Sequence, residues 1–149
     1  MAARFQFRLE PLRKLREALE REAQRALARA LQAEQEARAH LDSLATQRLA
    51  IFEARRLAAG QVLDLELWRA GERYLVVLER RQVEGYARLR AASAQVAAAR
   101  EALTQAHREH LMLVRLKERR ALQHAMEQQR REILEMDELA ILRHHRESA

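Results

Sequence analysis

Apolar side chains recur at helical spacing along almost the whole chain, and this periodicity constrains the fold more than any other feature. In steps of eleven, one register reads Leu19, Ala30, Leu41, Phe52, Leu63 and Tyr74, and a second reads Ala92, Leu103, Val114, Ala125 and Met136. Eleven residues is close to three turns of an α-helix, so each register lies along one narrow stripe. Such a chain forms a seam between helices and has little room for a catalytic pocket. The pattern therefore indicates an interaction protein.

The composition favours an all-α fold. Aromatic residues make up 4% of the 149 residues, 34% are charged, and there are only one proline and three glycines. Ala, Leu, Arg, Glu and Gln dominate, which is typical of long helices and coiled coils. We therefore expect one antiparallel two-helix coiled-coil hairpin that spans residues 1–149 and carries an overhanging C-terminal helix.

No catalytic or cofactor motif is present in the sequence. The three glycines are isolated, so they cannot form a phosphate-binding loop. There is no cysteine, which excludes disulfides and thiolate metal ligands. His107 and His110 lie three residues apart on one helix face, but a third metal ligand is not evident. We expect a protein that is not an enzyme and that holds no cofactor and no metal.

The helix boundaries are predicted from a few residues that typically start or end a helix. Pro11 suits the first turn of a helix, where backbone N–H groups are unpaired anyway, and the first arm is predicted over about 9–58. The turn covers about 59–64, with Gly60 as the C-terminal stop and Asp64 as the cap of the next helix. The second arm is predicted over about 65–145.

A fold-back near residue 61 predicts which parts of the two arms meet. Residue i of the first arm then lies opposite about residue 122 minus i of the second, so Ala37 faces Gly85. The same rule places His110 and His107 opposite Leu12 and Leu15. The first-arm stripe that enters this seam is Leu12, Leu15, Leu19, Ala23, Ala26, Ala30, Ala33, Ala37, Leu41 and Leu44. Small residues thus face small residues through the middle of the hairpin, which permits close helix approach.

Two parts of the chain have more apolar residues than one seam can bury. Residues 114–146 have no first-arm partner under the pairing rule, although they include Ile133, Met136 and Leu139. At the other end, residues 75–78 point all round the helix, and four aromatic residues gather there, namely Phe52, Trp68, Tyr74 and Tyr86. Unburied apolar residues of this kind mark binding surfaces.

Several segments of the chain resemble the flagellar type III export protein family FliJ. They are the opening Phe-x-Phe-Arg-Leu-Glu-Pro-Leu-Arg-Lys-Leu-Arg-Glu at residues 5–17, the segment from Trp68 to Tyr74-Leu75, Leu-Lys-Glu-Arg-Arg at 116–120 and Met-Asp-Glu-Leu-Ala at 136–140. Their order and spacing carry the resemblance, which covers nearly the whole chain.

The resemblance implies a set of partners and a role. FliJ-like proteins are coiled-coil hairpins similar to the central stalk of rotary ATPases. They sit in the hexameric export ATPase FliI and promote its ring assembly, contact the cytoplasmic domain of the export gate protein FlhA, and associate with export chaperones. By this resemblance we expect a cytoplasmic protein, peripheral at the inner face of the cell membrane. No apolar run approaches the ~20 residues of a membrane span, so direct insertion is not expected.

The resemblance also assigns contact residues to the two ends of the hairpin. The gate contact at the tip is expected at Leu44, Gln47, Ile51, Tyr74, Leu78 and Arg81. The ATPase contact at the end that carries the termini is expected at Arg13, Lys14, Arg16, Lys117, Arg119 and Arg120, because clustered bases suit an acidic ring lining.

Three other interpretations of the sequence stay open. The net charge of +6, from 28 bases and 22 acids, suits nucleic acid and predicts binding that falls steeply with salt. Acids alternate with bases along both arms, however, so we expect no nucleic-acid partner. The FliJ-like counterpart of injectisome secretion systems shares the same architecture. A generic structural coiled coil would pair residues 114–146 with a second copy and form a dimer.

Overall fold

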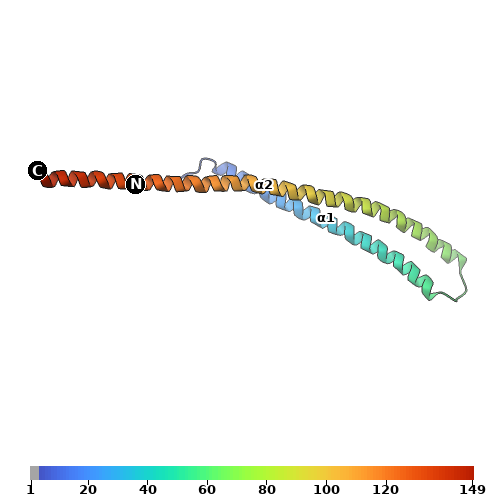
Figure 1. The fold of residues 1–149 in the computed structure, drawn as a ribbon. Helices are drawn as coiled ribbons and strands as arrows, with labels where there is room; N and C mark the ends of the chain where they lie inside the picture. The colour runs from blue at the N-terminus through green and yellow to red at the C-terminus, as the bar shows by residue number, and fades with distance from the viewer. Residues whose placement is uncertain (1–3) are drawn as a thin grey trace. The chain divides into compact units, whose positions relative to one another are not determined.

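The structure, a computed structural model, describes residues 4–149 and contains two long helices (Figure 1). Helix α1 spans Glu10–Leu57 and helix α2 spans Leu65–Ser148. They pack against each other as a hairpin, which confirms the predicted all-α fold. No separate overhanging helix follows in the described part of the chain, because the C-terminal residues continue α2 itself.

The helix ends are fixed by the residues that the sequence singles out. Pro11 lies in the first turn of α1. After Leu57 the chain turns, and Gly60 adopts a φ of 89°, a left-handed conformation that glycine accepts without strain. The Asp64 carboxylate then accepts hydrogen bonds from the backbone N–H groups of Glu66 at 3.1 Å and Leu67 at 3.3 Å. Asp64 is thus the N-cap of α2, as predicted.

The hairpin packs as two units, which we describe one at a time. The tip unit is Glu22–Thr104, with the turn between the helices at its end. The terminal unit combines residues 4–21 with Gln105–Ala149.

The tip unit holds an apolar core between its helices. Leu41, Leu44 and Leu78 form this core, and the partly buried Ile51, Leu75 and Leu89 pack against it. Leu44 and Leu78 are the most deeply buried large side chains, with 2% and 0% of their surface exposed. Ala37 and Val96 are also buried in this unit, and tertiary packing of this kind supplies most of the stability of a helix.

The pairing register in the tip unit differs from the predicted one by about one helical turn. Gly85 lies against Leu41, whose Cδ2 is 2.7 Å from the position of a Cβ at residue 85, and the prediction that Gly85 faces Ala37 is wrong. The physical reason is bulk. A leucine needs a glycine opposite if the helices are to stay close, whereas alanine tracts accept neighbouring registers equally well.

The terminal unit pairs its helices through a different face of α1. Leu12, Leu15 and Leu19 were predicted to enter the seam, but all three are exposed. Glu20 contacts His107 and His110, so the prediction that these histidines meet leucines is wrong. On this stretch α2 presents imidazole, carboxylate and ammonium groups, and leucines packed on them would leave those polar groups without partners.

The paired part of α2 also reaches further than predicted. Lys117 bonds Glu10 at 2.9 Å, and the ring of His124 lies 5.6 Å from that of Phe5 in the segment that precedes α1. Phe7 in the same segment is buried, with 8% of its surface exposed. Residues before and at the start of α1 therefore contact α2 well beyond Leu113. From residue 129 to residue 149, every residue is exposed.

Neither helix, among the described residues, offers a stretch long and apolar enough to cross a membrane.

Candidate interaction sites

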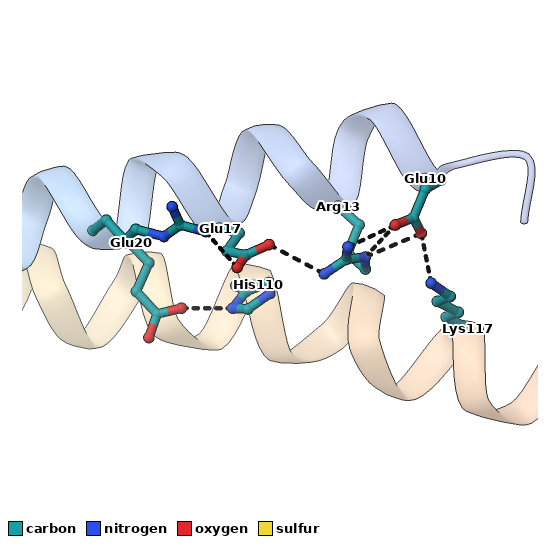
Figure 2. Close-up of polar contacts among 7 residues, drawn as sticks. Glu10, Arg13, Glu17, Glu20, His110 and Lys117 are labelled. Atoms are coloured by element: carbon teal, nitrogen blue, oxygen red, sulfur yellow. Dashed lines mark hydrogen bonds and ion pairs between the residues drawn. The ribbon is translucent and has the colours of Figure 1, made fainter.

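The terminal unit is joined by a polar seam, made of Glu10, Arg13, Arg16, Glu17 and Glu20 on α1 and His107, Glu109, His110 and Lys117 on α2. Figure 2 shows most of this seam, with the side chains of both helices turned toward one another. Arg16 bonds Glu109 across the helices at 2.6 Å, and Arg13 bonds Glu10 at 2.6 Å and Glu17 at 3.3 Å along α1. Charge pairing of this kind fixes the register of the two helices.

The carboxylate of Glu20 contacts two histidine side chains. One carboxylate oxygen lies 2.8 Å from Nδ1 of His107, and the other lies 2.6 Å from Nδ1 of His110. Nε2 of His110 is buried and has no hydrogen-bond partner among the described residues. The spacing of the two histidines places them on one helix face, but their contact with Glu20 depends on the helix register and could not be predicted from spacing.

Three carboxyl groups of the seam, those of Glu10, Glu17 and Glu20, have lowered pKa values. The Arg13 side chain, followed by Lys117, lowers the pKa of Glu10 from 4.5 to about 2. Hydrogen bonding to Arg21 lowers the pKa of Glu17, and hydrogen bonding to His107, then His110, lowers that of Glu20. Glu10 in turn raises the pKa of Arg13. All four effects favour the charged forms that the ion pairs need.

The six predicted ATPase-contact residues all lie in the terminal unit, in two different environments. Arg13, Arg16 and Lys117 are engaged in the polar seam. Lys14, Arg119 and Arg120 are exposed and make no ion pair with any described residue. The last three are therefore the basic side chains of this set that an external partner can reach directly.

From Leu122 onward, α2 carries exposed apolar side chains on several faces. Each of them has at least half of its surface exposed: Leu122, Met126, Ile133, Leu134, Met136, Leu139, Ile141 and Leu142. A helix that is apolar on more than one face is normally enclosed by other helices, so this segment is a candidate binding surface.

At the tip, Arg55 of α1 holds Trp68 of α2 in place. The guanidinium carbon lies 3.7 Å from the centroid of the indole ring, a cation–π contact, and a terminal nitrogen bonds Glu72 at 2.7 Å. Arg55 also donates to the backbone carbonyl oxygen of Trp68 at 3.4 Å. Gly71 leaves space for the guanidinium, since Nη2 of Arg55 is 3.0 Å from the position of a Cβ there. Nothing in the sequence distinguishes this arginine from the many others in the chain.

A groove of about 900 Å³ opens beside this contact, between the end of α1 and the start of α2. We call it the tip groove; its lining includes Phe52, Val62, Leu63, Leu67, Trp68 and Tyr74. All six are exposed, so the aromatic residues that the sequence grouped do gather on one accessible surface, except Tyr86.

The six predicted gate-contact residues are divided between the core and the surface. Leu44 and Leu78 are buried in the apolar core. Tyr74 is exposed and its hydroxyl donates to Oε1 of Gln47 at 2.7 Å. Ile51 is half-buried and lines the tip groove, whereas Arg81 is exposed.

No group of three or more metal-ligating side chains suits a metal ion within residues 4–149. The sites described above are two exposed surfaces and a polar seam.

Comparison with known proteins identifies the family. The family model of the flagellar FliJ protein matches residues 5–149, nearly the whole chain, so it includes both the tip and the terminal unit. Neither the curated proteins nor the solved structures produced a match. The match confirms the resemblance seen in the sequence, and with it a non-catalytic role in flagellar protein export. The chain belongs to the FliJ family.

Proposed function

We propose that this protein is the central stalk of the flagellar export ATPase. Its terminal unit enters the FliI-like hexamer and promotes ring assembly, while its tip contacts the cytoplasmic domain of the FlhA-like gate and receives export chaperones. The protein works in the cytoplasm at the inner face of the cell membrane. Family membership over residues 5–149 supports the export role. The presence of one accessible surface in each unit supports the division of labour.

The exposed C-terminal part of α2 is the observation that carries the ATPase contact. All residues from 129 to 149 are exposed, and apolar side chains such as Ile133, Met136 and Leu139 lie among them. Removing such side chains from water on binding contributes roughly 25 cal/mol per Å², and a surrounding ring would cover several helix faces at once. Lys14, Arg119 and Arg120 add exposed positive charge that steers an acidic partner.

The tip groove supports the gate contact. Tyr74 and Trp68 are exposed aromatic side chains on a rigid helix, and residues of this type dominate binding energy at interfaces. Arg55 fixes the ring of Trp68, so little side-chain entropy is lost when a partner covers it. Leu44 and Leu78 contribute indirectly, because their packing in the apolar core holds the two helices of the tip unit together.

A charge-reversal variant tests the ATPase contact. Lys14→Glu, Arg119→Glu and Arg120→Glu together should lower stimulation of the cognate ATPase by about tenfold, because three steering charges are inverted. The matched control is Arg88→Glu, Arg90→Glu and Arg100→Glu, which makes the same charge change on exposed bases of the tip unit. Equal loss in both variants, or unchanged stimulation in the first at physiological salt, would contradict the proposal.

A separate pair of substitutions tests the gate contact. Tyr74→Ala with Arg81→Ala removes two exposed tip side chains, so binding of the gate domain in a pull-down should fall at least about tenfold while ATPase stimulation stays at the wild-type level. Loss of both partners from this variant would show that the two ends do not act separately.

A further inference from the structure

We propose that the exposed end of α2 pairs with the same segment of a second copy of this chain, as an antiparallel two-helix coiled coil centred between Leu134 and Glu135. The paired segment runs from Leu122 to Glu147. This pairing goes beyond the export role, because it needs no other protein. It also keeps the ATPase contact covered in the free protein, a consequence that rests on the proposed function.

One face of this segment carries a mostly apolar stripe with the spacing of a coiled coil, which we call the C-terminal stripe. Positions a and d of a seven-residue repeat are occupied, alternately four and three residues apart, by Leu122, Met126, Gln129, Ile133, Met136 and Ala140. All six are exposed. The half-buried residues of this stretch lie on another face of the helix, and they are Ala121, His124 and Gln128. The stripe is therefore uncovered within one chain, and a stripe this narrow suits one further helix.

Two charged residues beside the C-terminal stripe indicate what that helix is. Arg130 and Asp137 lie on the same edge of the stripe, both are exposed, and neither makes an ion pair with any described residue. No base lies within one turn of Asp137 on its own helix, because the residues three and four positions away are Ile133, Leu134, Ala140 and Ile141. In the proposed alignment, Arg130 of each copy lies beside Asp137 of the other. The two copies are thus complementary in charge at two symmetric positions.

Other antiparallel alignments bring like charges together. Sliding one copy by a heptad sets the two Arg130 residues side by side in one direction and the two Asp137 residues side by side in the other. The slide that joins the Asp137 residues also sets Ile133 against Arg143 across the stripe, whereas in the proposed alignment Ile133 lies against Met136. The proposed alignment therefore buries the apolar pair and satisfies the charges at the same time.

The opposite edge of the C-terminal stripe favours the antiparallel orientation. In a parallel pair, Glu132 of one copy lies beside Asp137 of the other, and these like charges repel. In the antiparallel pair, Glu132 lies beside Leu139 and meets no acid. Glu132 meets Arg146 only in the slid alignment that also joins the two Asp137 carboxylates, so the gain on one edge is offset on the other.

Exchange of charge between two variants tests the pair in the full-length chain. Sedimentation equilibrium should show wild-type dimers that increase with concentration. Arg130→Asp alone and Asp137→Arg alone should each raise the dissociation constant of the dimer at least about tenfold, because both ion pairs become pairs of like charge. An equimolar mixture of the two variants should associate as the wild type does, because each pair in the mixed dimer again joins an acid and a base.

Arg131→Asp and Glu138→Arg are the matched controls. They make the same two charge changes at exposed positions on the opposite face of the helix, so each should form the dimer as the wild type does. Circular dichroism should show the same helix content in all variants. None of these measurements involves the ATPase, so their outcome is separate from that of the ATPase contact.

Four outcomes would overturn the proposal. They are a wild-type chain that stays monomeric up to about 0.1 mM, single variants that associate as strongly as the wild type, an equal loss of association in the controls, and a mixture of the Arg130 and Asp137 variants that does not regain the dimer.

Discussion

Gly85 and Gly71 both lie in the tip unit on α2, but an added methyl group would meet different surroundings. At Gly85 it would lie 2.7 Å from Cδ2 and 3.4 Å from Cγ of Leu41, a core side chain held on both sides. At Gly71 it would lie 3.0 Å from Nη2 of Arg55, the far end of a flexible side chain that can move aside. The two glycines are therefore a matched pair for testing how tightly the helices approach.

We expect the alanine substitutions to act in opposite directions. Gly85→Ala should lower the free energy of unfolding by about 1 kcal/mol, since overpacking costs about 1–3 kcal/mol and the better helix propensity of alanine offsets about 1 kcal/mol of it. Gly71→Ala should raise it by up to about 1 kcal/mol. Urea unfolding followed by circular dichroism measures both, and a Gly85→Ala chain as stable as wild type would contradict the register described above.

Glu10 makes the terminal unit sensitive to strong acid. Its pKa is about 2 in the folded chain, against an ordinary value of 4.5, because Arg13 and Lys117 bond the carboxylate. A lowered folded pKa means that the stabilisation is present above about pH 4.5 and is lost as the pH falls through about 2. Glu10→Gln should therefore reduce the stability of the terminal unit at pH 7 and make no difference below about pH 2. Hydrogen exchange of the first turns of α1 checks this, and an equal difference at both pH values would contradict it.

At the scale of the helix, α1 presents one apolar stripe but uses it in only one of its two units. The sequence treats Leu15 and Leu44 as equivalent members of that stripe. In the tip unit Leu44 lies in the core, whereas in the terminal unit Leu15 is 54% exposed and a polar face of α1 meets α2. Periodicity shows which residues share a face, but it cannot show which face the partner helix occupies, because that depends on the side chains that the partner presents at that level.

The difference between the two leucines has a measurable consequence. Leu44→Ala should lower the free energy of unfolding by about 2–4 kcal/mol, because it removes a fully buried side chain and leaves a cavity. Leu15→Ala should change it by less than about 0.5 kcal/mol, as expected for an exposed position. Thermal unfolding of the two variants compares them, and similar losses in both would mean that Leu15 enters the seam after all.

At the scale of the whole chain, the fold could be predicted from the sequence more fully than the contacts. Gly60 and Asp64 mark the turn because each has a local conformational role, and local roles can be predicted from single residues. The register could not, because alanine tracts slide past each other at little cost and the alignment depends on particular contacts such as Gly85–Leu41 and Arg16–Glu109. An error of one turn was enough to miss the polar seam, and Arg55 could not be singled out because its role depends on Trp68, thirteen residues away across the turn.

The exposed end of α2 has a further consequence that follows from helix–coil thermodynamics. A separate helix of this length would be marginal in water, because its first turn is costly to form. The segment up to Ser148 avoids that cost, since it extends a helix that is already formed and only propagation remains. It will fray from its last residue inward, and its ordered length will shorten on warming. A partner that binds the last turn of α2 must therefore first order that turn. A partner that binds α2 nearer His124 contacts a helix that is already formed. The affinities of these two modes of binding will therefore depend differently on temperature.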